Sequence, residues 1–135
     1  MLESRLGDGF AYQGYDLQPQ VPSAIRLDLR RELPEREFDV VFCLGLLEYL
    51  PDLEGFLAGV GRISPLAVVS YVIADSPDEL SERERMDRGW VNHYSRAQFP
   101  ALCKRAGHVV RDSLLIEEGR TVLCLLESRH RRVGQ

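Results

Sequence analysis

Two long apolar runs in the middle of the chain dominate its hydrophobic pattern. Residues 38–44 and 66–74 are nearly continuous apolar segments that are rich in β-branched side chains. Such runs are typical of strands buried on both faces, as in a parallel sheet with helices above and below it. One apolar helix face separates them, made by Leu53, Phe56, Leu57 and Val60. Asp52 can cap this helix and Pro65 can end it, so the pattern predicts a strand–helix–strand unit.

Shorter strand candidates stand before this unit, at residues 12–17 and 24–29. The segment between them is rich in breakers and too short for a full helix. After the unit, Ser76-Pro77-Asp78-Glu79 has the pattern of a capping box, which predicts an exposed helix through about Met86.

The last third of the chain predicts one more helix and a hairpin. A second capping box, Ser95-Arg96-Ala97-Gln98, opens a helix that ends at Gly107, and its buried face is expected to hold Phe99, Leu102, Cys103 and Ala106. Strand-like runs at 108–116 and 120–127 flank Glu117-Glu118-Gly119, where glycine can supply a positive φ. The expected fold class is a three-layer α/β sandwich whose mostly parallel sheet ends in an antiparallel hairpin.

The composition fits one globular domain. The 135 residues are 44% hydrophobic, 28% charged and 8% aromatic. We expect a single domain over residues 1–128 and a flexible basic tail over 129–135. The 17 basic and 21 acidic residues give a net charge of −4, which argues against a nucleic-acid partner.

The chain lacks the sequence features of a membrane or disulfide-bonded protein. No apolar run reaches the roughly 20 residues that span a bilayer, and the start lacks the layout of a signal peptide, so we expect a cytoplasmic protein without a membrane partner. The three cysteines, Cys43, Cys103 and Cys124, are expected to be reduced core thiols, with no metal site. His108 and His130 are expected at the surface.

Acidic residues stand where the two short strands end, and ligands of an open parallel sheet lie beyond such carboxyl ends. Asp16 can accept hydrogen bonds from the vicinal hydroxyls of a ribose, or it can form an Asx-type turn before Pro19. Asp28 can accept from an exocyclic amino group while Leu29 packs on a base, or it can be a solvated loop acid.

A third strand end carries glycine instead of an acid. Cys43-Leu44-Gly45 closes the first long strand, and Leu46–Asp52 follows with an apolar start. Glycine lets backbone approach a ligand closely. The alternative is a packed turn between strand and helix.

Taken in order, Gly14-Tyr15-Asp16-Leu17, Asp28-Leu29 and the run from Glu37 to Asp52 resemble the class I S-adenosylmethionine-dependent methyltransferases. The similarity begins at their second strand, includes the motif after their fourth strand and covers about Tyr12 to Glu127. It implies a Rossmann-like fold, S-adenosylmethionine as cofactor, and methyl transfer to a small-molecule or sugar-like acceptor. In this family Asp16 would hold the ribose hydroxyls, Asp28 and Leu29 would border the adenine, and the methionine side would be lined by Cys43, Leu44 and Gly45.

The chain departs from the family before Asp16. The family's glycine-rich loop, an acid followed by Gly-x-Gly-x-Gly, is missing there, and Gly7-Asp8-Gly9 is the only candidate. We therefore expect a truncated fold that lacks the family's first strand, which lies between the second and fourth strands of its sheet. The strand through Asp16 must then pair directly with the strand through Val41, or leave an edge that another molecule covers, as in a homodimer.

Residues 89–95 fall where the family's loop after the fifth strand often meets the substrate. His93 is the catalytic candidate, because an imidazole can remove a proton from an acceptor hydroxyl or amine; the alternative is a structural histidine at a helix start. Trp90 and Tyr94 are candidates for stacking on an acceptor, or for a hydrophobic staple.

These observations favour two functions of different classes. The first is a methyltransferase, or a truncated part of one. The second is a non-catalytic, methyltransferase-like binding module that has lost the cofactor loop. A nicotinamide-dependent enzyme is less favoured, because its fingerprint needs the same missing loop and does not predict the final hairpin.

Overall fold

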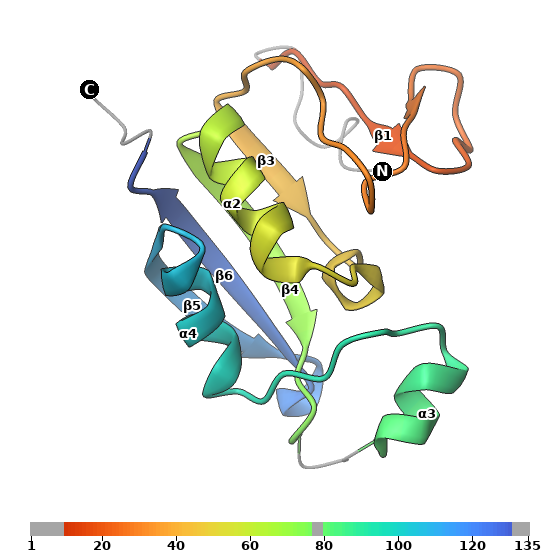
Figure 1. Cartoon of the computed structure of the whole chain (residues 1–135), viewed down its shortest axis with the longest axis vertical. Coiled ribbons are helices and arrows are strands. Elements are labelled where there is room, and N and C mark those ends of the chain that lie inside the picture. Colours follow the sequence, from red (N-terminus) through yellow and green to blue (C-terminus); the bar gives the residue numbers. More distant parts are fainter. Residues whose placement is uncertain (1–9, 77–79, 131–135) are drawn as a thin grey trace. The chain divides into compact units, whose positions relative to one another are not determined.

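The computed structural model describes residues 10–76 and 80–130 and divides into two compact units, Met1–Pro34 and Glu35–Gln135 (Figure 1). Gly7-Asp8-Gly9 and most of the expected basic tail lie outside the described residues.

The first unit holds a short parallel pair. β1 (Tyr15–Asp16) pairs with β2 (Ile25–Arg26) in the expected parallel direction, with Tyr15 opposite Ile25. Both strands are shorter than the predicted 12–17 and 24–29. The apolar side chains that suggested longer strands are exposed, among them Tyr12, Leu17 and Ile25, so there is little burial to extend the pairing.

The second unit is built on a four-stranded sheet in the order β3-β4-β6-β5. β3 (Val40–Cys43) runs parallel to β4 (Leu66–Val72), with Cys43 opposite Val69, and forms one edge of this sheet. β6 (Thr121–Ser128) is antiparallel to both β4 and β5 (His108–Ile116). The predicted parallel unit and terminal hairpin are therefore confirmed.

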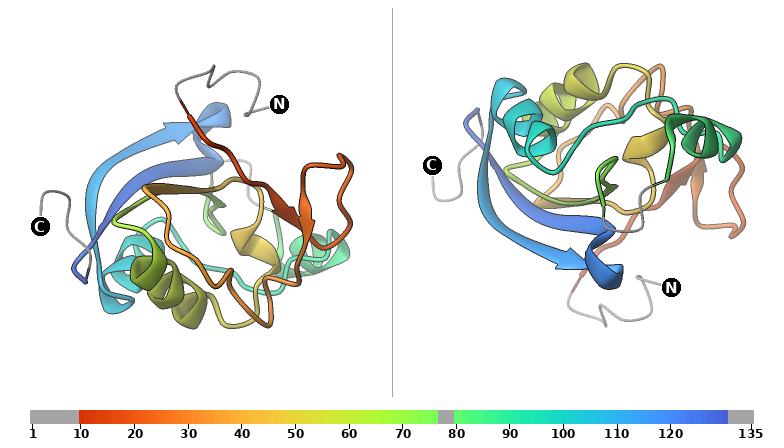
Figure 2. Two further views of the ribbon diagram at one scale, coloured as in Figure 1. Left: turned by 90° about the horizontal axis from the view of Figure 1, so that it is seen from above. Right: turned by 90° about the horizontal axis from the view of Figure 1, so that it is seen from below.

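Two helices cover one face of this sheet (Figure 2), so sheet and helices make two of the expected layers within this unit. In α2 (Leu53–Ile63) the predicted apolar face is buried, and the Asp52 side chain accepts from Gly55 N at 3.0 Å as the expected cap. α4 (Gln98–Arg105) is opened by the predicted box: Gln98 N donates to Ser95 Oγ at 3.1 Å, and Ser95 N donates to Gln98 Oε1 at 2.9 Å. The core between these layers includes Leu57, Val69, Phe99, Leu102, Cys103 and Leu126.

The helix after β4 begins later than predicted. Pro77–Glu79 of the expected capping box lie outside the described residues, and α3 spans Glu82–Asp87. Its cap is a capping box that the sequence analysis did not identify, in which Ser81 Oγ accepts from Glu84 N at 3.1 Å. The short helix η1 (Leu47–Tyr49) follows β3.

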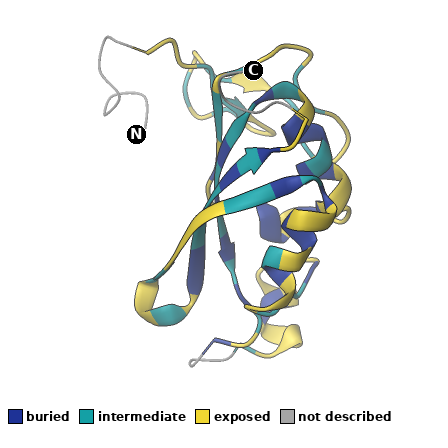
Figure 3. Cartoon of the chain, turned by 90° about the vertical axis from the view of Figure 1, so that its left-hand side faces the viewer, coloured by how far each residue is buried: buried dark blue, intermediate teal, exposed yellow. Residues whose placement is uncertain are grey.

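The hairpin connection η2 (Glu117–Gly119) differs in its backbone from the prediction. Gly119 has the expected positive φ, but Glu117 and Glu118 also have positive φ values, of 52° and 58°. Figure 3 shows the end of the hairpin as exposed, whereas buried and intermediate residues alternate along β4.

The three cysteines are free and buried, as predicted. Burial raises the pKa of the thiols of Cys43 and Cys103 to about 12, so they stay protonated at neutral pH. The expectation for His108 was wrong, because its ring is buried and bonds to Leu57 O at 2.7 Å. Burial also lowers the pKa of this imidazole. A position at the start of a strand does not reveal that a helix carbonyl lies within reach.

Candidate functional site

The turn after β3 presents open backbone at the carboxyl end of a parallel strand. Cys43 is buried, whereas Leu44 is 52% exposed. Gly45 has a φ of +70°, and a Cβ built on it would meet no atom within 4 Å. Gly45 N donates to Ser70 Oγ at 3.0 Å, which attaches the turn to β4. This is the position at which open α/β sheets bind ligands, and the glycine leaves room for close approach.

β4 continues beyond the end of β3, and side chains complete its free edge. Val72 N donates to Glu48 Oε2 at 2.7 Å, and Val72 O accepts from Arg85 Nη1 at 2.8 Å. The N–H and C=O of one strand residue point the same way, so an acid from η1 and a base from α3 lie along the same edge. They supply the bonds that a neighbouring strand would otherwise make.

Arg85 is the centre of this polar network, with 1% of its surface exposed. Its Nε donates to His93 Nδ1 at 3.0 Å, and its Nη2 donates to Asn92 O at 3.2 Å and Tyr71 Oη at 3.3 Å. Within the described residues, no carboxylate lies within 4.0 Å of its guanidinium. Carbonyls, an imidazole and a phenol therefore replace water around a buried cation.

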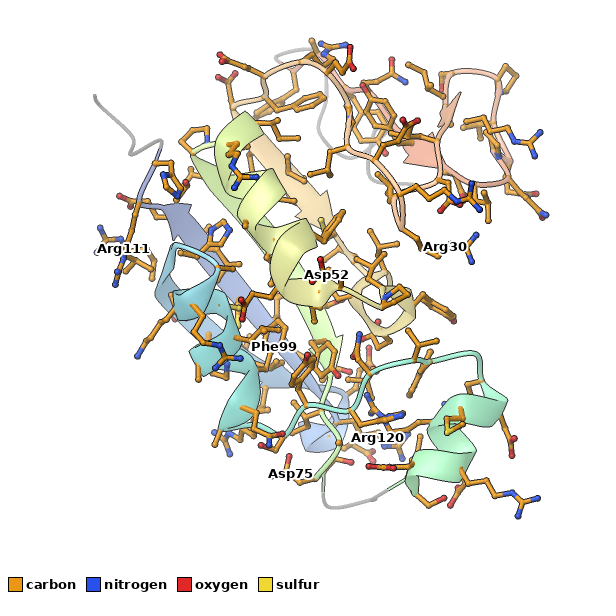
Figure 4. All side chains as sticks on the ribbon, viewed as in Figure 1. Arg30, Asp52, Asp75, Phe99, Arg111 and Arg120 are labelled. Carbon is orange, nitrogen blue, oxygen red and sulfur yellow. The ribbon has the colours of Figure 1, made fainter. Side chains whose placement is uncertain are left out.

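Tyr71 and Asn92 connect Arg85 to the turn. Tyr71 Oη donates to Asn92 Oδ1 at 2.5 Å and accepts from Tyr94 N at 2.9 Å. The Tyr71 ring stacks on Phe99, with centroids 4.6 Å apart and planes 6° apart; Figure 4 labels Phe99 on α4. The polar network, defined as Glu48, Tyr71, Arg85, Asn92 and His93, thus rests on the apolar core.

Burial raises the pKa of Tyr71 from its ordinary 10.0 to about 12. The unfolded chain would lose this proton near pH 10 and the folded chain near pH 12, so this contribution to stability is complete below pH 10 and is lost as pH rises from 10 to 12. We expect the alkaline phenolate absorbance of wild type minus Tyr71→Phe to rise near pH 12. A difference that titrates near pH 10, like a free phenol, would contradict the buried geometry.

His93 is held in one tautomer by its partner. Because Arg85 Nε can only donate, His93 Nδ1 must accept, and a neutral ring then carries its proton on Nε2. The ring is half-buried, so Nε2–H is the group it can offer to a ligand. Proton removal by Nδ1 would first require the bond to Arg85 to break.

The two aromatic candidates are also engaged. The guanidinium carbons of Arg85 and Arg88 lie 5.0 and 5.3 Å from the centroid of the Trp90 ring. These cations compete with an acceptor for stacking on the indole. Tyr94 is half-buried, and the centroid of its ring lies 6.1 Å from that of Tyr71.

The acids proposed for the cofactor's adenosine belong to the first unit. Asp28 accepts from Arg30 Nε at 2.9 Å and Nη2 at 3.0 Å, and this side-chain hydrogen bond lowers the pKa of Asp28 (Figure 4 labels Arg30). Leu29 is half-buried beside it. Asp16 is exposed, and its Oδ1 accepts from Gln18 N at 3.3 Å, which is the geometry of the Asx-type alternative. The other candidates, Cys43 to Gly45 and Trp90 to Tyr94, lie in the second unit.

Sequence reasoning missed four residues of the network: Glu48, Tyr71, Arg85 and Asn92. Arg85 stands in a Glu-Arg-Glu-Arg segment that is typical of a solvated helix, and Tyr71 stands within an apolar run. The one available signal was Asn92, the only asparagine of the chain, which stands next to His93.

No family model matches this chain, and no curated protein matches it. Solved structures match its fold. A chain in the complex between the Haloferax volcanii Trm112 methyltransferase activator and a proposed methyltransferase has a TM-score of 0.73 at 15% identity, covering 87% of this chain and 72% of that chain. An S-adenosylmethionine-dependent methyltransferase from Clostridium acetobutylicum ATCC 824 has a TM-score of 0.64 at 10% identity, covering 86% and 74%.

This chain has a methyltransferase fold. Its Rossmann-like α/β architecture is similar to that of the class I methyltransferases, as the resemblance implied. The chain spans about a third of the longer matches: the similarity covers 34% of LaPhzM, at a TM-score of 0.58 and 16% identity over 78% of this chain. Among the described residues, no helix has the length and apolar character needed to cross a membrane.

Proposed function

We propose that this chain is an S-adenosylmethionine-dependent methyltransferase, or part of one, that acts on a small-molecule or sugar-like acceptor. The observation that carries the proposal is the open turn at Leu44 and Gly45, which follows a parallel strand of a methyltransferase fold. Solved structures of this fold support it: CalO1 is a methyltransferase of calicheamicin biosynthesis in an SAH-bound form, and NcsB1 is an O-methyltransferase in complex with SAH and 1,4-dihydroxy-2-naphthoic acid.

The proposed roles follow the resemblance. Asp16 holds the ribose hydroxyls, and Asp28 with Leu29 borders the adenine. Cys43, Leu44 and Gly45 would hold the methionine portion, and the exposed Leu44 and Gly45 would contact its polar groups. When bound there, S-adenosylmethionine would supply an electrophilic methyl group to the nucleophile of the acceptor. The chain's contribution to such a transfer is mainly orientation of the two reactants.

His93, Trp90 and Tyr94 are the proposed acceptor-side residues. With Nδ1 bonded to Arg85, His93 orients an acceptor by donating from Nε2. That bond also favours the alternative function, a non-catalytic binding module, because the basic nitrogen is occupied. One neighbour described as a pericyclic reaction enzyme has a TM-score of 0.66 at 11% identity, so this fold also occurs with a different reaction.

Calorimetry with S-adenosylhomocysteine tests the cofactor assignment, and Gly45→Val is the informative variant. A β-branched residue is strained at a φ of +70° and fills the open approach, so we expect at least a tenfold weaker affinity. Gly107→Val is the matched control, because Gly107 also has a positive φ, of 93°, but lies after the C-cap of α4. It should cost stability and leave the affinity unchanged. A folded wild-type chain that binds no S-adenosylhomocysteine would sink the proposal.

A further inference from the structure

Asn92 joins two segments that are distant in the sequence. Its Nδ2 donates to both Leu47 O and Leu50 O, at 2.9 Å each, and these carbonyls belong to η1 and the residue that ends it. Val91 N adds a bond to Glu48 O at 2.9 Å. The segment 90–94 is therefore fastened to η1, which directly follows the turn at Gly45.

The Asn92 side chain has no freedom left in this arrangement. Each hydrogen of the amide meets one carbonyl, and Leu47 O also accepts from Leu50 N at 3.3 Å within η1. Its Oδ1 accepts from Tyr71 Oη at 2.5 Å, so both ends of the amide are fixed. Only 8% of the surface of Asn92 is exposed, so losing one of these hydrogen bonds would lower the stability of the fold.

We propose that Asn92 is a positioning residue that sets the acceptor-side segment 90–94 against the cofactor-side turn 43–45. The inference rests on the proposed function for its ligands. The lock, defined as the hydrogen bonds of the Asn92 side chain to Leu47 O, Leu50 O and Tyr71 Oη, does not depend on that function. Ligand binding at the turn should then change the environment of segment 90–94. Binding at segment 90–94 should likewise change the affinity of the turn for its ligand, because coupling between two sites is reciprocal.

The only asparagine of the chain gives a direct probe. With selective ¹⁵N-asparagine labelling, the side-chain amide yields one pair of proton signals that belongs to Asn92. We expect both protons to exchange slowly with water in the wild-type chain, and saturating S-adenosylhomocysteine to shift them. Fast exchange of either proton would overturn the lock, and signals that do not move in a complex that forms would overturn the coupling.

Asn92→Asp tests the same point by substitution. The carboxylate still accepts from Tyr71, but it cannot donate to Leu47 O or Leu50 O. We expect at least tenfold faster amide hydrogen exchange at Leu50 and Val91, with no change in β6, and about tenfold weaker S-adenosylhomocysteine affinity.

Gln98→Glu is the matched control, since it makes the same amide-to-carboxylate change at an exposed capping position. It should leave both readouts unchanged. Faster exchange with unaltered affinity would overturn the positioning role. If the wild-type chain binds no S-adenosylhomocysteine, the proposed function fails, and the exchange rates alone decide whether Asn92 locks the segments. If Asn92→Asp does not fold, the wild-type amide signals still decide.

Discussion

Replacing Arg85 with methionine is expected to lower the free energy of unfolding by roughly 3–5 kcal/mol. Methionine fills much of the volume of the arginine stem but donates no hydrogen bond. Val72 O, Asn92 O and His93 Nδ1 would each lose a donor inside the protein. Arg85→Lys should recover part of the loss, because one ammonium cannot reach all the acceptors that a planar guanidinium spans.

Urea unfolding followed by circular dichroism measures this effect, and Arg88→Met provides the control. Arg88 follows α3 and is exposed, although its guanidinium also lies over Trp90. Its replacement should change the stability by less than about 0.5 kcal/mol. Equal losses for the two variants would mean that the buried contacts of Arg85 contribute nothing.

The regular elements could be predicted because their signals are local. The apolar face of α2, its Asp52 cap and the box at Ser95 each depend on residues within two turns of one another. Continuous apolar runs likewise identified β3 and β4 as strands, and these pair in parallel. The lengths of the two short strands were overestimated because local apolar residues were taken to indicate burial. Such residues, Ile25 among them, are exposed in the first unit.

The polar network could not be predicted because its members come from four separate parts of the chain. Arg85 is buried only because Tyr71, Asn92 and His93 supply acceptors around it, and sequence spacing does not reveal that meeting. The candidate turn at Gly45 was found, because a glycine after a buried strand has a direct physical meaning. The side chains that hold this turn in place were not predicted.

Glu48→Leu is expected to lower the free energy of unfolding by roughly 2–4 kcal/mol, although leucine is the more hydrophobic residue. Glu48 is 2% exposed, and its carboxylate is the acceptor for Val72 N. Leucine would leave that N–H without a partner at the free edge of β4. It would also remove the negative charge that lies along the same edge as the Arg85 guanidinium.

Two further variants separate these contributions in the same urea experiment. Glu48→Gln keeps an oxygen acceptor for Val72 N and loses only the charge, so we expect a loss of about 1 kcal/mol. Glu54→Leu makes the leucine change at an exposed glutamate in the first turn of α2, whose ion pair with Arg105 is on the surface, and should cost less than about 1 kcal/mol. If Glu48→Leu is no more damaging than Glu54→Leu, the edge of β4 does not need the carboxylate. A large loss for Glu48→Gln as well would show that charge, more than the hydrogen bond to Val72, holds η1 and α3 on this edge.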